Sequence, residues 1–563
     1  MFCYQCGCPV DANDRYCPQC GAQLIENQQE PLRNAVVNKY FDIELPVGQP
    51  KEIVRGYILT HVEALAKHLD VRGDDIRDIL EEFVAIRSKV GIVYQIIDMG
   101  NYFNNPKNAQ WTDFHRILSK HYLEDSNNHV TPDYLFIIGG CDIVPMPSIP
   151  VQVHRDKDID ADLPYEYLYE DHIESSILNH SIFKKKTILL CGRLPLASDT
   201  TFAVFVRMLH NTLMAGMKGL RNMNLHAQCD PNWKNVTALA VEGFRKHLPQ
   251  RFEKNDMFHG PVMLTPQFET QTIAFESNFP YRQASVFYYN LHGTNMPDVD
   301  PFVGYTLGNG ERKSALLPQN MASVMQPNMV VTEACYGGWF KRSDNQRESK
   351  QKHETILLSA MHAATVCYVG SSRVAYGTVD TSHPPQLSLA DVLANAFLQS
   401  LYKGSSAGVA LHRAKTAVLN SLNGEESLRF ITILEFNLFG DPTLAAVTSS
   451  DGYGHKSCES TLLHADAPIL LECKVEYDSK TGHSLLDTVR NLVNRNLREI
   501  NSLLTNHLYS MYGVIPRQLN CVMSHKLSDG TCQYTYSYEA ANGEWLVGID
   551  KQSKNILYAV CSK

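Results

Sequence analysis

The sequence predicts an α/β protein whose mainly parallel sheet is covered by helices on both faces. From residue 131 onward, short apolar runs typical of buried strands alternate with longer runs of helical periodicity. The predicted strands are 133–139, 187–191, 285–291, 329–333 and 365–370, and the predicted helices are 200–216, 235–248, 354–363, 387–402 and 405–422. Apolar strands joined by helical crossovers are typical of parallel sheets buried between helices.

Residues 36–450 are predicted to form one α/β unit with two halves, roughly 36–200 and 201–450. In its opening part, helices are expected over 53–69, 76–90 and 114–122, and a strand over 91–97. His115 and His121 are expected on the solvated side of the third helix.

Composition narrows the class of protein. The chain has 563 residues, 44% hydrophobic and 20% charged, with a net charge of -9 and no large basic block, which argues against bulk nucleic-acid binding. No segment has the length and polarity of a transmembrane helix. The first residues have neither a basic region nor an apolar core, which predicts a cytoplasmic protein. In that reducing compartment, most of the 15 cysteines are expected to be thiols.

Two predicted strands end in residues that can perform nucleophilic chemistry. Met329–Thr332 leads to Cys335, and Val286–Leu291 leads to His292 and Gly293. If these strands are parallel neighbours, Cys335 and His292 meet at the carboxyl edge of the sheet, where open α/β folds bind ligands. A thiol attacks as its thiolate and needs a base beside it.

The backbone N–H groups of Gly293 and Cys335 could then bind a developing oxyanion. The alternative is an ordinary buried cysteine and a core histidine. Each motif alone favours that alternative, whereas the pair of motifs favours catalysis. No third catalytic residue is evident, and the role of Glu333, two residues before Cys335, stays open.

The motif that ends in His292-Gly293, followed by Glu333-Ala-Cys-Tyr-Gly337, resembles the caspase-type cysteine peptidases, and within them most of all the gingipain family. Four further stretches carry the resemblance in the family's order: Tyr134–Pro145, Asp160–Tyr165, Cys191–Pro195 and Phe436–Leu444. Together they span roughly residues 130 to 446.

The resemblance implies a cysteine endopeptidase that works through an acyl-enzyme, with Cys335 as nucleophile and His292 as general base and acid. It also matches Asp162 to the family aspartate that receives arginine, which implies cleavage after Arg or Lys. A carboxylate can pair bidentately with a guanidinium. Neighbouring loop acids remain alternatives, and Asp160 is the nearest rival.

Two segments near the nucleophile are assigned by analogy. Ser371, Ser372 and Arg373 are expected to offer backbone hydrogen bonds to an extended substrate, the alternative being a simple strand-to-loop turn. Phe340–Lys352 is polar and basic, and it reads as a mobile surface loop. Its basic residues are candidate self-cleavage positions, unless it is a plain solvated loop: Lys341, Arg342, Arg347, Lys350 and Lys352.

Residues 1–25 are predicted to form a zinc ribbon. Two Cys-x-x-Cys pairs, Cys3 with Cys6 and Cys17 with Cys20, fit a tetrahedral site whose Zn²⁺ is structural, since four thiolates leave no open position. The alternative is two unrelated pairs in a tail. Docking of a protein partner is the expected role.

Residues 451–563 are predicted to form a small α+β domain of unassigned function. A helix over 482–506 precedes four alternating segments, 518–525, 533–539, 545–550 and 555–561. Taken together, these observations predict a peptidase that acts on proteins and has no membrane partner. Its activity is expected to be regulated by a protein partner or by proteolysis. The rival readings are a catalytically silent peptidase-like scaffold and a zinc-ribbon adaptor. Dependence on Ca²⁺ is left open.

Overall fold

The protein is described from a computed structural model. The structure describes residues 53–446 apart from 154–155, 169–171, 185–188, 222–224, 246–262, 267–283, 297, 306–311, 343–346, 379–386 and 422–425, a few residues before 53 (39–41, 43 and 50), and four strands between 518 and 562. Within these ranges, no helix is long and apolar enough to cross a membrane.

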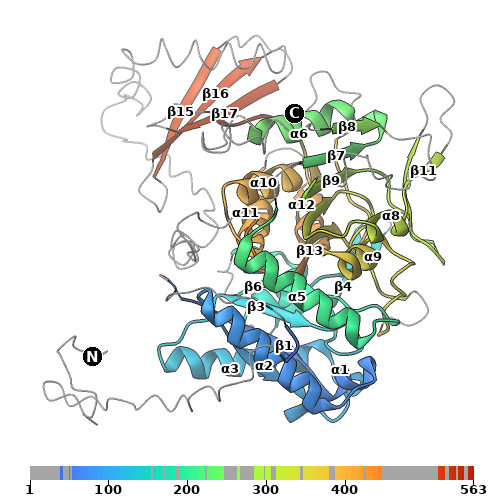
Figure 1. The fold of residues 1–563 in the computed structure, drawn as a ribbon. Helices are drawn as coiled ribbons and strands as arrows, with labels where there is room; N and C mark the ends of the chain where they lie inside the picture. The colour runs from blue at the N-terminus through green and yellow to red at the C-terminus, as the bar shows by residue number, and fades with distance from the viewer. Residues whose placement is uncertain are drawn as a thin grey trace, which may run out of the picture.

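The main element is a mixed sheet of ten described strands in the order β2-β1-β3-β6-β14-β13-β12-β9-β7-β8 (Figure 1). The first five run parallel to one another, and so do the last five. The two blocks are antiparallel where β13 meets β14. The predicted largely parallel sheet is therefore present, with one reversal of direction at its centre.

The first block consists of β1 (Val54–Thr60), β2 (Ile92–Asp98), β3 (Tyr134–Ile138), β6 (Leu190–Leu194) and β14 (Phe436–Gly440). The second consists of β7 (Leu225–Cys229), β8 (Met263–Pro266), β9 (Val286–Asn290), β12 (Asn328–Thr332) and β13 (Thr365–Ser371). Two hairpins lie outside the sheet: β4 (Ser148–Val153) with β5 (Asp156–Asp160), and β10 (Phe302–Tyr305) with β11 (Arg312–Leu316).

Helices connect these strands. They are α1 (Val62–Leu69), α2 (Gly73–Lys89), α3 (Trp111–Asn127), α4 (Ile173–Leu178), α5 (Phe202–Lys218), α6 (Lys234–Arg245), α8 (Pro318–Ala322), α9 (Ile356–Ala363), α10 (Ala390–Tyr402), α11 (Ala407–Leu419) and α12 (Glu426–Glu435). Short 3-10 turns lie at Met99–Asn101, Pro106–Asn108, Leu163–Glu166, Ser181–Lys184 and Pro231–Trp233. Side-chain caps begin several of the helices; Thr201 at α5 and Ser406 at α11 each accept a backbone N–H of the first turn.

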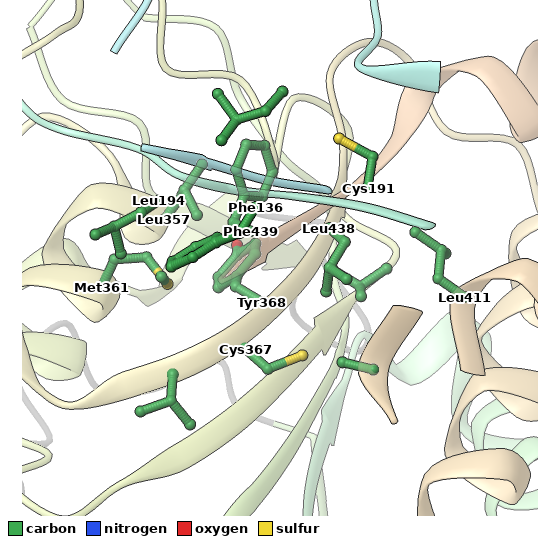
Figure 2. Close-up of a cluster of buried hydrophobic side chains, with 14 of the residues drawn as sticks. Phe136, Cys191, Leu194, Leu357, Met361, Cys367, Tyr368, Leu411, Leu438 and Phe439 are labelled. Atoms are coloured by element: carbon green, nitrogen blue, oxygen red, sulfur yellow. The ribbon is translucent and has the colours of Figure 1, made fainter. Parts of the chain in front are cut away.

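One hydrophobic core continues across the seam between the two blocks. Figure 2 shows Phe136 of the first block close to Phe439 and Tyr368, with Leu357 and Met361 of α9 beside them. Tyr368 and Phe439 pack edge to face, with ring centroids 6.3 Å apart. Burial on both faces explains why these strands read as continuous apolar runs in the sequence.

The opening region differs from the prediction in two places. Residues 54–60 form strand β1, and only 62–69 are helical, whereas one helix was predicted over 53–69. The strand is rich in β-branched and aromatic residues, and periodicity alone does not separate such a short apolar run from a buried helix. His115 is buried, and its Nε2 lies 2.8 Å from the Tyr167 carbonyl, so its predicted solvated position is wrong.

Near the C-terminus, four strands form a separate antiparallel sheet in chain order: β15 (Gln518–Lys526), β16 (Cys532–Ala540), β17 (Gly543–Asp550) and β18 (Ile556–Ser562). They match the four alternating segments expected from the sequence. The helix predicted over 482–506 lies outside the described residues.

Candidate active site

Strands β9 and β12 place His292 and Cys335 at the same edge of the sheet. The two strands are parallel neighbours, with Thr332 opposite Tyr289, as predicted. The segments that follow them touch: a Cβ added to Gly293 would lie 1.6 Å from the Cys335 carbonyl oxygen and 2.8 Å from its backbone nitrogen. Gly293 therefore packs directly on the backbone of Cys335, at a distance that only glycine allows.

The turn after Cys335 is strained and held from several sides. Tyr336 has a φ of 56°, a left-handed conformation that is unusual for a bulky residue. Its N–H donates to the Arg373 carbonyl over 2.8 Å, and the Gly338 N–H donates to the Ser371 carbonyl over 2.7 Å. The Tyr368 hydroxyl donates to the Gly337 carbonyl over 2.7 Å. These bonds fix the partly exposed Cys335 thiol, which lies 3.8 Å from the Ala375 carbonyl.

His292 is held by its backbone and by two neighbours. Its N–H and carbonyl both bond to Val303 of β10. Its Nε2 lies 3.8 Å from Oδ2 of Asp230, a buried carboxylate. The ring of Trp233 lies 4.2 Å from the imidazole, centroid to centroid. A carboxylate beside one ring nitrogen orients the imidazole and leaves the other nitrogen to exchange a proton.

Asp230 is a functional candidate that the sequence reasoning missed. It directly follows β7, Leu225–Cys229, and its Oδ1 accepts the backbone and side-chain N–H groups of Asn232. His226 and Gln228 interrupt the apolar pattern of that strand, so the strand was not predicted. The signal that could have found Asp230 is an acidic residue before Pro231, at the expected start of a helix.

Asp162 lies elsewhere and already has a partner. Its carboxylate makes a bidentate ion pair with Arg193, with Oδ2–Nε at 2.7 Å and Oδ1–Nη2 at 2.6 Å, and the guanidinium is wholly buried. The predicted role of Asp162 in receiving a substrate arginine therefore needs correction: the chain's own arginine occupies it. Its rival Asp160 is also paired, with Lys341 at 2.6 Å and Arg373 at 2.9 Å.

Glu333, close to Cys335 in the chain, forms a pair with another carboxyl group. Glu333 precedes Cys335 by two residues, and its side chain hydrogen-bonds to Asp391 of α10 and accepts the Tyr288 hydroxyl. The second carboxyl, Asp391, also accepts the backbone N–H groups of Thr378 and Ser388. Burial, together with the neighbouring Asp391, raises the pKa of Glu333 well above its ordinary value. Burial raises the pKa of Asp391 to about 6. The pair therefore shares a proton near neutral pH.

The predicted substrate-binding segment is used inside the protein. The Ser371 and Arg373 carbonyls bind the turn after Cys335, and the Ser372 N–H donates to the Glu435 carbonyl over 2.9 Å. The Arg373 N–H lies 3.2 Å from the Ser371 hydroxyl. The expectation that these backbone groups serve an extended substrate is thus revised, because the Cys335 turn folds back onto the end of β13.

The segment 340–352 is anchored at both ends. Lys341 and Ser349 form an antiparallel bridge. The ammonium groups of Lys341 and Lys350 are buried in ion pairs with Asp160 and Asp300, each at 2.6 Å. Lys341 and Lys350 are therefore not accessible cleavage positions, and the prediction of a loop that is mobile throughout is wrong for its ends.

The four predicted zinc ligands, Cys3, Cys6, Cys17 and Cys20, lie outside the described residues. Among the residues that the structure does describe, no cluster of three or more His, Cys, Asp or Glu side chains could hold a metal ion.

Several solved structures resemble this fold. They include the Arg-specific cysteine proteinase gingipain R, at 11% identity and a TM-score of 0.45 over 71% of this chain and 80% of that one. A complex of the pro- and mature domains of Porphyromonas gingivalis RgpB gives 10% identity and a TM-score of 0.43 over 69% and 79%. The Saccharomyces cerevisiae separase–securin complex gives 11% and 0.30 over 55% and 16%. At these scores the likeness assigns no function to any residue.

No curated protein is significantly similar to the chain in sequence. The family model of peptidase family C25 matches residues 66–447, which is more than half of the 563 residues and includes both His292 and Cys335. The chain therefore belongs to peptidase family C25, the gingipain family of cysteine peptidases, and is a hydrolase.

Proposed function

We propose that this cysteine peptidase is an endopeptidase that cuts proteins after a basic residue, with Cys335 as nucleophile and His292 as general base and acid. The observation that carries the catalytic assignment is the packing of Gly293 on the Cys335 backbone, which joins the two motifs in one site. The ion pair of His292 with Asp230 supports the role of the imidazole.

The mechanism follows from these groups. His292 takes the proton from the Cys335 thiol, and the sulfur attacks the scissile carbonyl carbon, so that a C–S bond forms and the carbonyl oxygen becomes an oxyanion. The backbone N–H groups of Gly293 and Cys335 bind that oxyanion. The C–N bond then breaks, and the amine leaves with the proton from His292. Water attacks the acyl-enzyme, again with His292 as base, and releases the acid and the thiol.

The preference for arginine or lysine is assigned to Glu333 and Asp391, and no longer to Asp162. Both carboxyl groups are buried, and they share a proton instead of an ion pair with a basic side chain in the described part of the protein. Glu333 lies two residues before Cys335 in the chain. A substrate guanidinium or ammonium would replace that proton and leave the net charge of the site unchanged, which gives a basic residue an advantage over an isosteric neutral one.

The test is a panel of fluorogenic peptides that differ only at the residue before the cut. Cleavage is expected after arginine or lysine and is expected to be absent in Cys335→Ala. Glu333→Gln should reduce the preference for basic residues, whereas Asp162→Asn should leave it in place. Cleavage that survives Cys335→Ala would refute the nucleophile, and an unchanged preference in Glu333→Gln would refute the specificity assignment. Partner binding without any cleavage would favour the scaffold.

We further propose that residues 1–25 bind one structural Zn²⁺ through Cys3, Cys6, Cys17 and Cys20 and dock a protein partner. Metal analysis should find one Zn²⁺ per chain in the wild type and none after Cys3→Ser and Cys6→Ser together. Peptide cleavage should continue without the metal, because four thiolates close its coordination sphere. We also propose a cytoplasmic location, which cell fractionation can test.

A further inference from the structure

Asp160 belongs to the first half of the chain, but its side chain contacts two residues near the Cys335 turn, Lys341 and Arg373. Asp160 is the last residue of β5, and its carbonyl accepts a hydrogen bond from the Asn437 side chain at 3.0 Å. The carboxylate is buried, with 1% of the residue exposed. Its position is thus set by the β4–β5 hairpin and by β14 of the central sheet.

Two cations from opposite sides of the turn converge on this carboxylate. Lys341, which follows the turn, places its Nζ 2.6 Å from Oδ1 of Asp160 and 3.1 Å from the Met146 carbonyl. Arg373, which follows β13, places Nη2 2.9 Å from Oδ2. The Arg373 guanidinium also donates to the Asp158 carbonyl and lies 5.7 Å from the centre of the Trp339 ring. One acid therefore holds both Lys341, which follows the turn, and Arg373, which follows β13.

The main chain of Arg373 transmits this anchoring to Cys335. Its carbonyl accepts the N–H of Tyr336, the residue held at a φ of 56° directly after the nucleophile. A left-handed conformation of a tyrosine is unfavourable and persists only where surrounding contacts impose it. The bond from Tyr336 to Arg373 is one such contact, and the side chain of Arg373 is held by Asp160.

We propose that Asp160 is a positioning residue of the peptidase: it binds Lys341 and Arg373 and thereby holds the turn after Cys335 in its catalytic conformation. The catalytic part of this role rests on the proposed function of Cys335. The anchoring of the turn by Asp160 can be tested whether or not Cys335 is the nucleophile. It also gives Asp160 a role different from substrate binding, since both of its oxygens already face cations of the chain.

The test compares Asp160→Asn with a matched control, Asp441→Asn, in the full-length protein. Asp441 is also a buried carboxylate, paired with Arg87 at 3.3 Å, but it binds no residue of the turn. Hydrogen exchange followed by mass spectrometry should show faster exchange of the peptide covering 334–340 in Asp160→Asn, by about fivefold, as expected when one hydrogen bond is loosened. The control should leave that peptide unchanged while lowering the melting temperature.

Catalysis supplies a second readout. Asp160→Asn should lower kcat by about 10- to 100-fold with a smaller change in KM, because a displaced nucleophile affects chemistry more than binding. Arg373→Met, which keeps an apolar stem beside Trp339, should reproduce both effects, and the double variant should lose less than the sum of the two single losses, because both changes remove the same Asp160–Arg373 pair. Arg373→Met also tests the proposal if Asp160→Asn does not fold.

Unchanged exchange at 334–340 in Asp160→Asn, or equal loss of kcat in Asp441→Asn, would overturn the proposal. Loss of cleavage specificity alone, with the turn still protected, would also overturn it and return Asp160 to substrate binding. The exchange measurement needs no activity. A failure of the proposed function, seen as cleavage that survives Cys335→Ala, is therefore distinct from a failure of this inference.

Discussion

Replacing Gly293 with alanine tests the geometry of the site most directly. The added Cβ would lie 1.6 Å from the Cys335 carbonyl oxygen, 2.6 Å from its carbonyl carbon and 2.8 Å from its nitrogen. Atoms in contact lie about 3.5 Å apart, so the two segments would have to separate by about 2 Å. No side-chain rotation relieves this clash, because every clashing atom belongs to the backbone.

The expected loss follows from that displacement. A misplacement of about 1 Å at a reacting group can cost about 100-fold in rate, which corresponds to about 2.7 kcal/mol of transition-state stabilisation. We therefore expect Gly293→Ala to lower kcat/KM by at least about 100-fold per folded molecule. The assay is cleavage of the best peptide of the panel, normalised to the folded fraction measured by circular dichroism.

A matched control separates this effect from general destabilisation. Gly192 in β6 also faces a backbone atom: an added Cβ would lie 2.4 Å from the Gly440 carbonyl oxygen, at the seam of β6 and β14. Gly192→Ala should lower the melting temperature but largely preserve kcat/KM of the folded enzyme. A folded Gly293→Ala variant with near-wild-type kcat/KM would refute the site geometry, and so would an equal loss in Gly192→Ala.

Three further predictions follow from other contacts. Asp230→Asn should lower kcat/KM by about 10- to 100-fold in the peptide assay, because His292 loses the neighbouring Asp230 carboxylate; this is part of what general acid–base catalysis supplies. An equal loss in Asn232→Ala would contradict this role. The folded protein binds a proton on Glu333 that the unfolded chain releases, so the free energy of unfolding should fall as pH rises above about 4.5, by up to about 1.4 kcal/mol per pH unit. Glu333→Gln should flatten that slope in urea unfolding at pH 5 to 8. An unchanged slope would count against a protonated Glu333. Tyr368→Phe should destabilise the protein by about 1 to 3 kcal/mol in thermal unfolding, since the carbonyl that its hydroxyl binds would remain buried without that donor, and a neutral effect would speak against the bond.

Much of the architecture could be predicted from local patterns. The strands that carry His292 and Cys335 are continuous β-branched and aromatic runs, and each ends in glycine-containing motifs, so their type was evident. Their pairing as neighbours was a hypothesis that the structure confirms. Strand β1 could not be predicted, because a short apolar run fits both the strand and the helix period. The burial of His115 could not be predicted either, because a polar side chain can bond to a carbonyl that is distant in sequence. Such burial is decided by tertiary contacts.

The acidic residues show the same limit more clearly. Asp160 and Asp162 are attractive candidates in the sequence because nothing local pairs with them. Asp162 pairs with Arg193, which is 31 residues away along the chain, and Asp160 pairs with Lys341, which is 181 residues away. Spacing along the chain says nothing about such pairs. Asp391, which shares a proton with Glu333, is likewise remote in sequence.

The sequence by itself singled out Cys335 and His292 as the candidate nucleophile and base, since hydrophobic strands followed by His-Gly and by Cys-x-Gly-Gly are local signals of element type and turn. Only the tertiary structure decided which carboxylate assists each group. A charge inside a protein is stable only beside its partner, and that partner is chosen by the packing of distant elements. The fold therefore places Asp230 beside His292, pairs Asp162 with Arg193, and joins Glu333, two residues before Cys335, to Asp391.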